Sequence, residues 1–360
     1  MFKFVVPLAV VVALLCFFRR DNFSAHGFAP FGFAGIAGAV SAGGIIFAYL
    51  GLTPIVSVAG EVRDPQRSIP IALILSVLLS TGIYFLLQVA FLGAVPATMA
   101  AHGWRGIDKL FALPFHDIAI ALGLGWLSFL VVCDAVISPS GCGNIYMNAT
   151  PRVVYGWARG GTFFRLFTRV DAKSGIPRPA LWLTLVLAVF WMLPFPSWSA
   201  MIKVVSAALV LSYAVAPVTV AALRRSAPDM PRPFRVRGFG VLGPSSFVVA
   251  ALIVYWSGWS VLCWLLGLQV VLFASYVAYQ AWRRVHRDAL ARDVHCALWL
   301  IGFYVLMIAV SWLGSFGGSS IVGAPWDSLL AAAVALLAYY WGERTGLPAS
   351  QLALDTEVGD

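Results

Sequence analysis

Long apolar runs are the feature that most constrains how this chain can fold. They recur through all 360 residues, of which 61% are hydrophobic and only 11% charged. A soluble core of this size would leave far more charged surface. A bilayer's hydrocarbon core is about 30 Å thick and needs roughly 20 helical residues per crossing. The sequence therefore predicts an all-α, polytopic transmembrane helical bundle of about ten helices, at residues 2–18, 33–59, 69–93, 116–147, 178–196, 200–223, 241–256, 259–281, 295–313 and 326–341.

Loop charges predict how these segments are oriented. Most of the 24 Lys and Arg residues fall in loops that share one side if the N-terminus is cytoplasmic, above all 148–177 and 224–240. Lys and Arg in short loops mark the cytoplasmic side. We therefore expect a multi-pass protein of the inner (plasma) membrane, with the lipid bilayer around it and both termini cytoplasmic. The net charge of +9 reflects this topology and does not indicate a nucleic-acid partner.

Several functional classes lack their motifs. No P-loop of the GxxxxGK[ST] type occurs, which argues against ATP-driven transport. No histidine or carboxylate cluster marks an enzyme site, and no channel filter sequence is present. The cysteines show no CxxC or zinc spacing and are interpreted as small packing residues, so no metal or cofactor is expected: Cys16, Cys133, Cys142, Cys263 and Cys296.

One apolar segment is interrupted near Gly51, Thr53 and Pro54. Thr followed by Pro is a good N-cap and N1 pair, because proline lacks the N–H that would be unpaired there. The pattern predicts a helix that ends near Leu50 and a short helix that starts near Pro54. Unpaired backbone groups at membrane depth are tolerated where they line a cavity or ligand site, as in secondary transporters. The alternative is a proline kink satisfied by neighbouring helices.

The chain resembles the amino acid permeases of the amino acid–polyamine–organocation superfamily. The resemblance rests on FAYLG at 47–51 with AGEVRDPQRSIP at 59–70, on ATPRVVYGWARGG at 149–161 with KSGIPRPALW at 173–182, and on MPRPFRVRG at 230–238. SWLGSFGG at 311–318 and PWD at 325–327 resemble the fourteen-helix bacterial branch, which includes aspartate:proton symporter-like members.

The resemblance implies a partial five-plus-five inverted-repeat fold and secondary transport of an amino acid by alternating access, coupled to a proton or sodium ion. Family members often carry an acidic residue where Thr53 stands, which makes a cationic substrate less expected here. The blocks align 2–18 with family helix five, so we expect a permease that lacks the first four helices, or a fragment without activity alone. The implied division is the last helix of the first repeat (1–19), the second five-helix repeat (32–223), a linker with two accessory helices (224–293), an appended helix pair (294–342) and a cytoplasmic tail (343–360).

The resemblance also implies a substrate site around the interrupted helix. Phe47 would close over a bound amino acid, and free carbonyls near Ala48 would meet its amine. Tyr146 and Ser206 are further contacts. Packing against lipid or core is the alternative for Phe47, and an interfacial position is the alternative for Tyr146. The expected substrate-binding residues are Phe47, Ala48, Tyr49, Leu50, Gly51, Leu52, Thr53, Tyr146 and Ser206.

Asp134 is the candidate for ion coupling, because an intramembrane carboxylate is costly and usually functional. It could instead be protonated and bonded to a neighbouring helix. Ser138, Ser140 and Asn144 offer oxygen ligands on the same segment, although small hydroxyls also occur in ordinary helix packing. A charged turn after the interrupted helix is expected to gate by ion pairs, with a solvated turn as the alternative; it contains Glu61, Arg63, Asp64 and Arg67.

Overall fold

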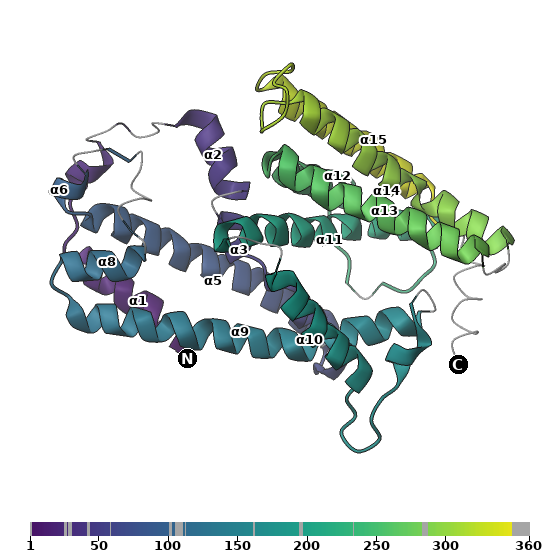
Figure 1. Ribbon diagram of the computed structural model, residues 1–360, viewed down its shortest axis with the longest axis horizontal. Coiled ribbons are helices and arrows are strands. Elements are labelled where there is room, and N and C mark those ends of the chain that lie inside the picture. Colours follow the sequence, from purple (N-terminus) through teal and green to yellow (C-terminus); the bar gives the residue numbers. More distant parts are fainter. Residues whose placement is uncertain are drawn as a thin grey trace. The chain divides into compact units, whose positions relative to one another are not determined.

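The protein is described by a computed structural model (Figure 1). It describes residues 2–24, 27, 31–41, 44–57, 59–100, 103–104, 111, 113–160, 163–193, 197–232, 234–282 and 287–347. All regular elements in these ranges are helices, which confirms the predicted all-α class. They are α1 (Phe2–Leu15), η1 (Arg20–Phe23), α2 (Gly32–Ser41), α3 (Ile45–Ala48), α4 (Thr53–Ser57), η2 (Ala59–Glu61), α5 (Pro65–Ala94), α6 (Ala97–Ala100), α8 (Pro114–Ala121), α9 (Gly125–Arg159), η3 (Arg165–Thr168), α10 (Arg178–Met192), α11 (Trp198–Ser226), α12 (Phe239–Trp256), α13 (Trp259–Trp282), α14 (Arg287–Leu313) and α15 (Trp326–Arg344).

Each of the ten expected apolar segments contains helix, but the segments differ in length. Six helices in the described ranges are long and apolar enough to cross a membrane, or seven if the bent pair at 35–57 is one crossing. Two others, α1 and α10, are apolar but have 14 and 15 residues. The chain is therefore a multi-pass membrane protein by length and composition.

The expected single segment at 116–147 is instead two helices. Helix α8 ends at Ala121, and Gly123 adopts a left-handed φ of +74° before α9 begins at Gly125. A glycine takes this conformation without the steric penalty of a side chain. Helix α9 then continues for 35 residues to Arg159, although it contains Pro139 and Pro151.

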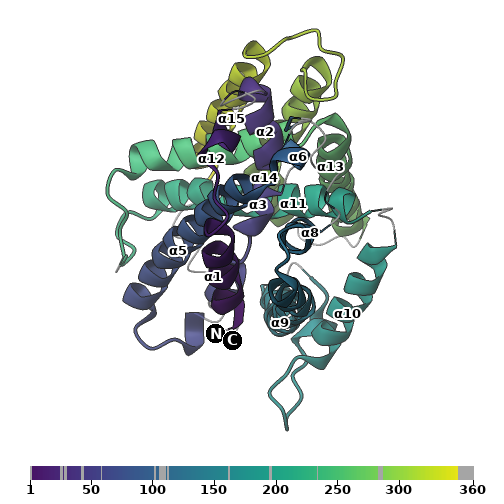
Figure 2. The same ribbon diagram turned by 90° about the vertical axis from the view of Figure 1, so that its left-hand side faces the viewer.

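Residues 1–32 and 51–190 form one compact unit, called unit 1. Helix α1 packs against α5 and α9, and α8 and α4 also pack against α9; Figure 2 shows α1 beside α5. The core includes Leu14, Ile118 and Leu127, all fully buried. The Asn22 amide donates to the carbonyl oxygens of Leu92 (2.9 Å) and of other residues at the end of α5, which fixes η1 to that helix end.

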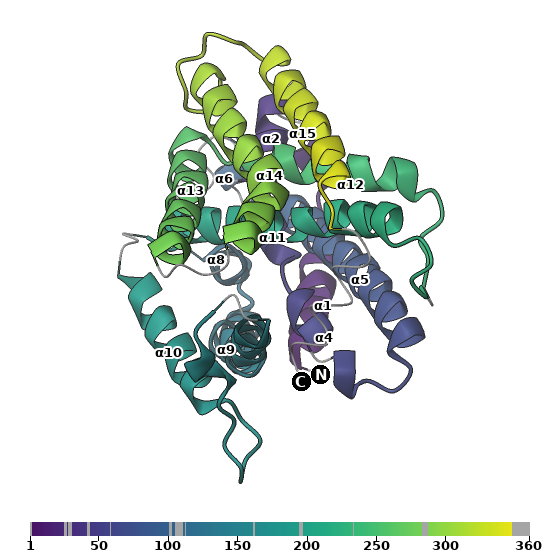
Figure 3. The ribbon, with the colours of Figure 1, turned by 90° about the vertical axis from the view of Figure 1, so that its right-hand side faces the viewer.

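Residues 33–50 and 191–360 form the second compact unit, called unit 2. Helices α11 to α15 pack around an aromatic core, in which the rings of Phe247 and Phe303 lie 5.1 Å apart. Helices α14 and α15 run alongside each other (Figures 1 and 3). Gly302 allows the close approach, because a Cβ atom there would lie 2.8 Å from the Trp341 ring.

Candidate substrate and coupling site

The predicted interruption of the helix is confirmed. Helix α3 ends at Ala48, residues 49–52 are not helical, and α4 begins at Thr53. The Leu50 amide donates to the Phe47 carbonyl oxygen (3.1 Å), a bond that tightens the last turn of α3. Helix α3 thus ends two residues before the expected Leu50, and α4 starts one residue before the expected Pro54.

The break leaves backbone donors without partners. Among the described residues, the amide groups of Gly51 and Leu52 make no hydrogen bond. Unpaired amide groups in the hydrocarbon region cost several kcal/mol each unless they line a cavity or ligand site. The break therefore leaves two backbone donors beside the start of α4.

The predicted substrate residues fall into both units. Phe47, with Ala48, Tyr49 and Leu50, belongs to unit 2, and so does Ser206. Helix α3 packs against α11, which carries Ser206. The Ser206 side chain is 1% exposed, and its Oγ has no hydrogen-bond partner in the part of the chain that the structure describes. It is thus a buried hydroxyl with an unused donor.

The remaining predicted residues belong to unit 1. Gly51, Leu52 and Thr53 lead into α4, which packs against α9, the helix that carries Tyr146. Tyr146 and Thr53 are both half-buried. The boundary between the two units falls between Leu50 and Gly51, inside the break itself.

The structure brings two of the four predicted coupling residues together. The Ser138 hydroxyl donates to the Asp134 carboxylate with an Oγ–Oδ1 distance of 2.6 Å. The Ser140 hydroxyl instead donates to the Val136 carbonyl oxygen of its own helix (2.7 Å). Asn144 accepts a hydrogen bond from the Asn148 amide. Pro139 follows Ser138 and removes one backbone donor from the helix beside this carboxylate.

The described side chains of the predicted gating turn lie on the surface of the protein. Arg63, Asp64 and Arg67 are exposed, and none of them makes an ion pair within the described ranges. Asp64 adopts a left-handed φ of 51°, and its carbonyl oxygen accepts from the Arg67 and Ser68 amides at the start of α5. The Glu61 side chain lies outside the described residues. The gating role stays a prediction.

No candidate metal centre is found where the structure describes the chain. Groups of three or more His, Cys, Asp or Glu side chains are absent from these residues. None of the five cysteines, all of which lie in the described ranges, forms a disulfide bond. The polar groups of the candidate site are instead amides, hydroxyls and one carboxylate, which suit a small zwitterion and a proton or alkali cation.

Comparison with known proteins identifies the family. A family model described as amino acid permease matches residues 1–285. The chain belongs to the amino acid permease family. It is 51% identical to an aspartate-proton symporter of Bacillus subtilis over 98% of this chain and 68% of that protein. It is also 35% identical to a glutamate/serine transporter of Bacillus subtilis over 99% of this chain and 66% of that protein.

More distant relatives agree with this assignment. A branched-chain amino acid permease of Bacillus subtilis is 24% identical over 75% of this permease and 56% of the relative. No solved structure matches significantly. The chain spans about two thirds of the length of the symporter and of the glutamate/serine transporter. The predicted class, a transporter rather than an enzyme, is confirmed at the level of the family.

Sequence reasoning missed a second interruption in this permease. Helix α2 ends at Ser41, and α3 begins after Gly44, whose φ is +89°. The Ser41 hydroxyl is buried and bonds to the carbonyl oxygens of Ala37 (2.9 Å) and Trp256 (2.8 Å), both in unit 2. The Gly43–Gly44 pair was the available signal, because consecutive glycines weaken a helix.

Proposed function

We propose that this permease carries out proton-coupled transport of an acidic amino acid, of the aspartate or glutamate class, by alternating access. Family membership supports amino acid transport. The names of the two relatives support an acidic substrate, and the first also supports proton rather than sodium coupling. The observation that carries the proposal is the pair of unbonded amide groups at Gly51 and Leu52.

These amide groups suit a carboxylate. Two backbone N–H groups beside the start of α4 are donors without partners in the described part of the chain. The substrate amine would meet carbonyl oxygens around Ala48, and the Phe47 ring would cover the bound molecule. The buried Ser206 hydroxyl is a further donor, since α3 and α11 pack together.

Coupling is assigned to Asp134 with Ser138. The Ser138 hydroxyl donates to the Asp134 carboxylate over 2.6 Å, and such a bond is charge-assisted whenever the carboxylate is ionised. When Asp134 takes up a proton, this bond loses its charge assistance. Protonation would thereby change the interactions of α9, the helix against which α4 packs. Ser140 and Asn144 serve helix packing in this account.

The charge pattern supports the proposed location. The cytoplasmic membrane, with both termini on the cytoplasmic side, accounts for the Lys and Arg residues of 148–177 and 224–240. The charged turn around Asp64 would then face the cytoplasm, where Glu61, Arg63 and Arg67 gate by forming ion pairs in one state of the transport cycle.

Uptake of labelled aspartate, glutamate and leucine into proteoliposomes tests the proposal. We expect an inward proton gradient to drive aspartate and glutamate uptake and to leave leucine uptake at background. Ser206→Ala should raise the half-saturating aspartate concentration about tenfold, the value of a hydrogen bond to a charged group.

Ser212→Ala is the matched control on the same helix, because the Ser212 hydroxyl donates to the Leu209 carbonyl oxygen (2.7 Å). It should leave the half-saturating concentration unchanged. Uptake that ignores the proton gradient, or that favours leucine, would contradict the proposed function. Equal effects of the two serine variants would remove Ser206 from the substrate site.

A further inference from the structure

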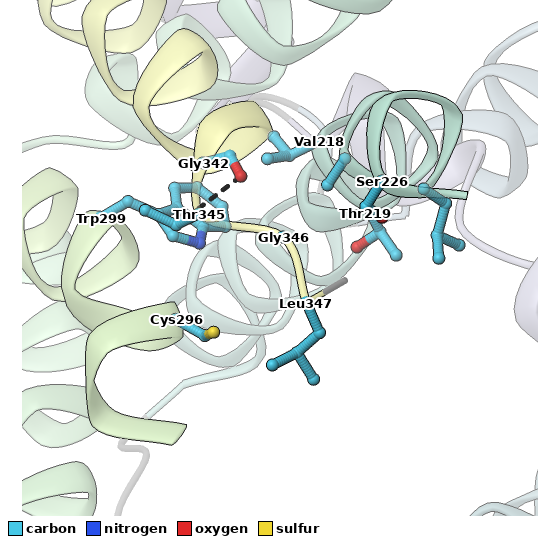
Figure 4. A pocket seen from close by; sticks show the side chains of 11 residues that line it. Val218, Thr219, Ser226, Cys296, Trp299, Gly342, Thr345, Gly346 and Leu347 are labelled. Atoms are coloured by element: carbon cyan, nitrogen blue, oxygen red, sulfur yellow. Dashed lines mark hydrogen bonds between the residues drawn. The ribbon is translucent and has the colours of Figure 1, made fainter. Parts of the chain in front are cut away.

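Unit 2 contains a crevice away from the interrupted helix. It has a volume of about 210 Å³ and lies where α11 and α15 end and α14 begins (Figure 4). Its walls are mainly apolar: Val218 and Ala222 come from α11, Trp299 from α14 and Leu347 from the segment after α15.

The helices that line the crevice pack very closely beside it. A Cβ atom at Gly342 would lie 2.6 Å from Val218 Cγ1 and 2.7 Å from the Trp299 ring, and one at Gly346 would lie 2.9 Å from Ala222 Cβ. Glycines therefore let α15 contact its neighbours at this level. The open space next to them is a shaped slot between well-packed walls.

One lining hydroxyl has no partner. The hydroxyls of Thr219 and Thr345 donate to the carbonyl oxygens of Val215 (3.0 Å) and Gly342 (3.2 Å). The Ser226 Oγ is buried and makes no hydrogen bond within the described residues. An unsatisfied buried hydroxyl costs about 1–3 kcal/mol, so an acceptor from a bound molecule would stabilise it.

Exposed arginines stand next in sequence to two residues that line the crevice. Arg225 and Arg344 are exposed and directly adjoin Ser226 and Thr345. The Arg232 guanidinium is held at the end of α11, where it donates to the carbonyl oxygens of Leu223 (2.8 Å) and Ala227 (2.6 Å). Two carboxylates, Asp229 and Glu343, belong to the same helix ends, so arginines are in excess.

Helix ends of membrane-crossing segments lie at the level of lipid headgroups. Both α11 and α14 contain segments that can cross a membrane. An apolar slot at that level, with exposed arginines next in sequence to its lining residues, suits the two parts of an anionic phospholipid. An amino acid zwitterion would leave the apolar walls unmatched.

We propose that this crevice binds one anionic phospholipid. An acyl chain fills the slot against Trp299, the phosphate lies near Arg225 and Arg344, and Ser226 donates to a phosphate or ester oxygen. The site would bind phosphatidylglycerol in preference to phosphatidylcholine.

Fluorescence quenching tests the site in the full chain reconstituted in phosphatidylcholine nanodiscs. Dibrominated phosphatidylglycerol is titrated in, because bromine quenches a tryptophan that its acyl chain touches. We expect a saturable quenching component that is absent from Trp299→Phe and much weaker with dibrominated phosphatidylcholine. Each arginine at an anionic lipid contributes roughly fivefold in affinity, so Arg225→Gln with Arg344→Gln should weaken binding about 30-fold.

Arg165→Gln with Arg169→Gln is the matched control, since it removes the same charge from an exposed loop of unit 1. It should leave the saturable component unchanged. Identical quenching curves for Trp299→Phe and the unmodified protein would overturn the proposal, as would equal affinity for the two lipids. A shortened protein that ends at Leu347 is also measured. If saturable quenching occurs in the shortened protein but not in the full chain, the residues after Leu347 occupy the crevice and the proposal is wrong.

Discussion

Asp327 offers the sharpest test of how unit 2 is held together. It lies at the start of α15 with 0% exposure, and no cation contacts it within the described ranges. Its carboxylate accepts hydrogen bonds from the Tyr255 hydroxyl (2.9 Å), the Ser315 amide (3.2 Å) and hydroxyl, and the Ser328 amide (2.5 Å). A buried charge held by neutral donors alone depends on every one of them.

The cost of losing this carboxylate follows from the donors left behind. Asp327→Ala leaves the hydroxyl of the buried Tyr255 and the amide of the buried Ser328 unpaired, at about 1–3 kcal/mol each, so we expect the free energy of unfolding to fall by about 2–6 kcal/mol. Asp327→Asn keeps one acceptor oxygen but places an NH₂ group opposite other donors. We expect its free energy of unfolding to be lower by about 1.5–3 kcal/mol. Tyr255→Phe removes one donor and should cost about 1 kcal/mol.

The assay measures the thermal unfolding midpoint of the purified protein in detergent. Unfolding is monitored by tryptophan fluorescence and by the fraction of protein that stays monodisperse after heating. Asp229→Asn is the control, because Asp229 is exposed and the charge change is the same. The expected order of midpoints is Asp229→Asn, then Tyr255→Phe, then Asp327→Asn, then Asp327→Ala. Equal midpoints for the two asparagine variants would refute the reasoning.

Two further predictions concern loops. Gly318→Ala should destabilise the protein by about 1–3 kcal/mol, because its Cβ would lie 2.5 Å from the backbone oxygen of Trp312; Gly323→Ala, with open space around it, should not change the unfolding midpoint. The Ser174 hydroxyl lowers the pKa of Asp171 below its ordinary 3.8. The bonds of the ionised carboxylate are therefore complete above pH 3.8 and lost as pH falls through the lower folded pKa. Hydrogen exchange of residues 171–178, corrected for intrinsic rates, should stay constant above pH 3.8 and rise as the pH falls below that value, and Asp171→Asn should abolish that rise.

Much of the fold could be predicted because membrane-crossing helices have a strong sequence signal. Apolar runs located every helix of more than 20 residues, and Thr53–Pro54 located the start of α4, since a cap and a proline act locally. The glycine-dependent break before Ile45 and the separation of α8 from α9 were missed. A glycine at Gly44 or Gly123 is equally compatible with helix packing, and only the folded backbone shows which one adopts a positive φ.

Only local contacts of the polar side chains could be predicted from the sequence. Asp134 and Ser138 are four residues apart on one helix, so their contact follows from helix geometry. The Asp327 network joins α12, the loop after α14 and α15, with residues up to 72 positions apart. Contacts of that kind depend on tertiary packing, and no local pattern predicts them.

Aspartate-induced proton entry is the measurement that tests the central claim most directly. Proteoliposomes loaded with a pH-sensitive dye should acidify when aspartate is added outside, and Asp134→Asn should abolish this acidification while Asp171→Asn, a matched carboxylate in an exposed loop, retains it. Aspartate uptake without acidification in the unmodified protein, or full acidification in Asp134→Asn, would contradict the account.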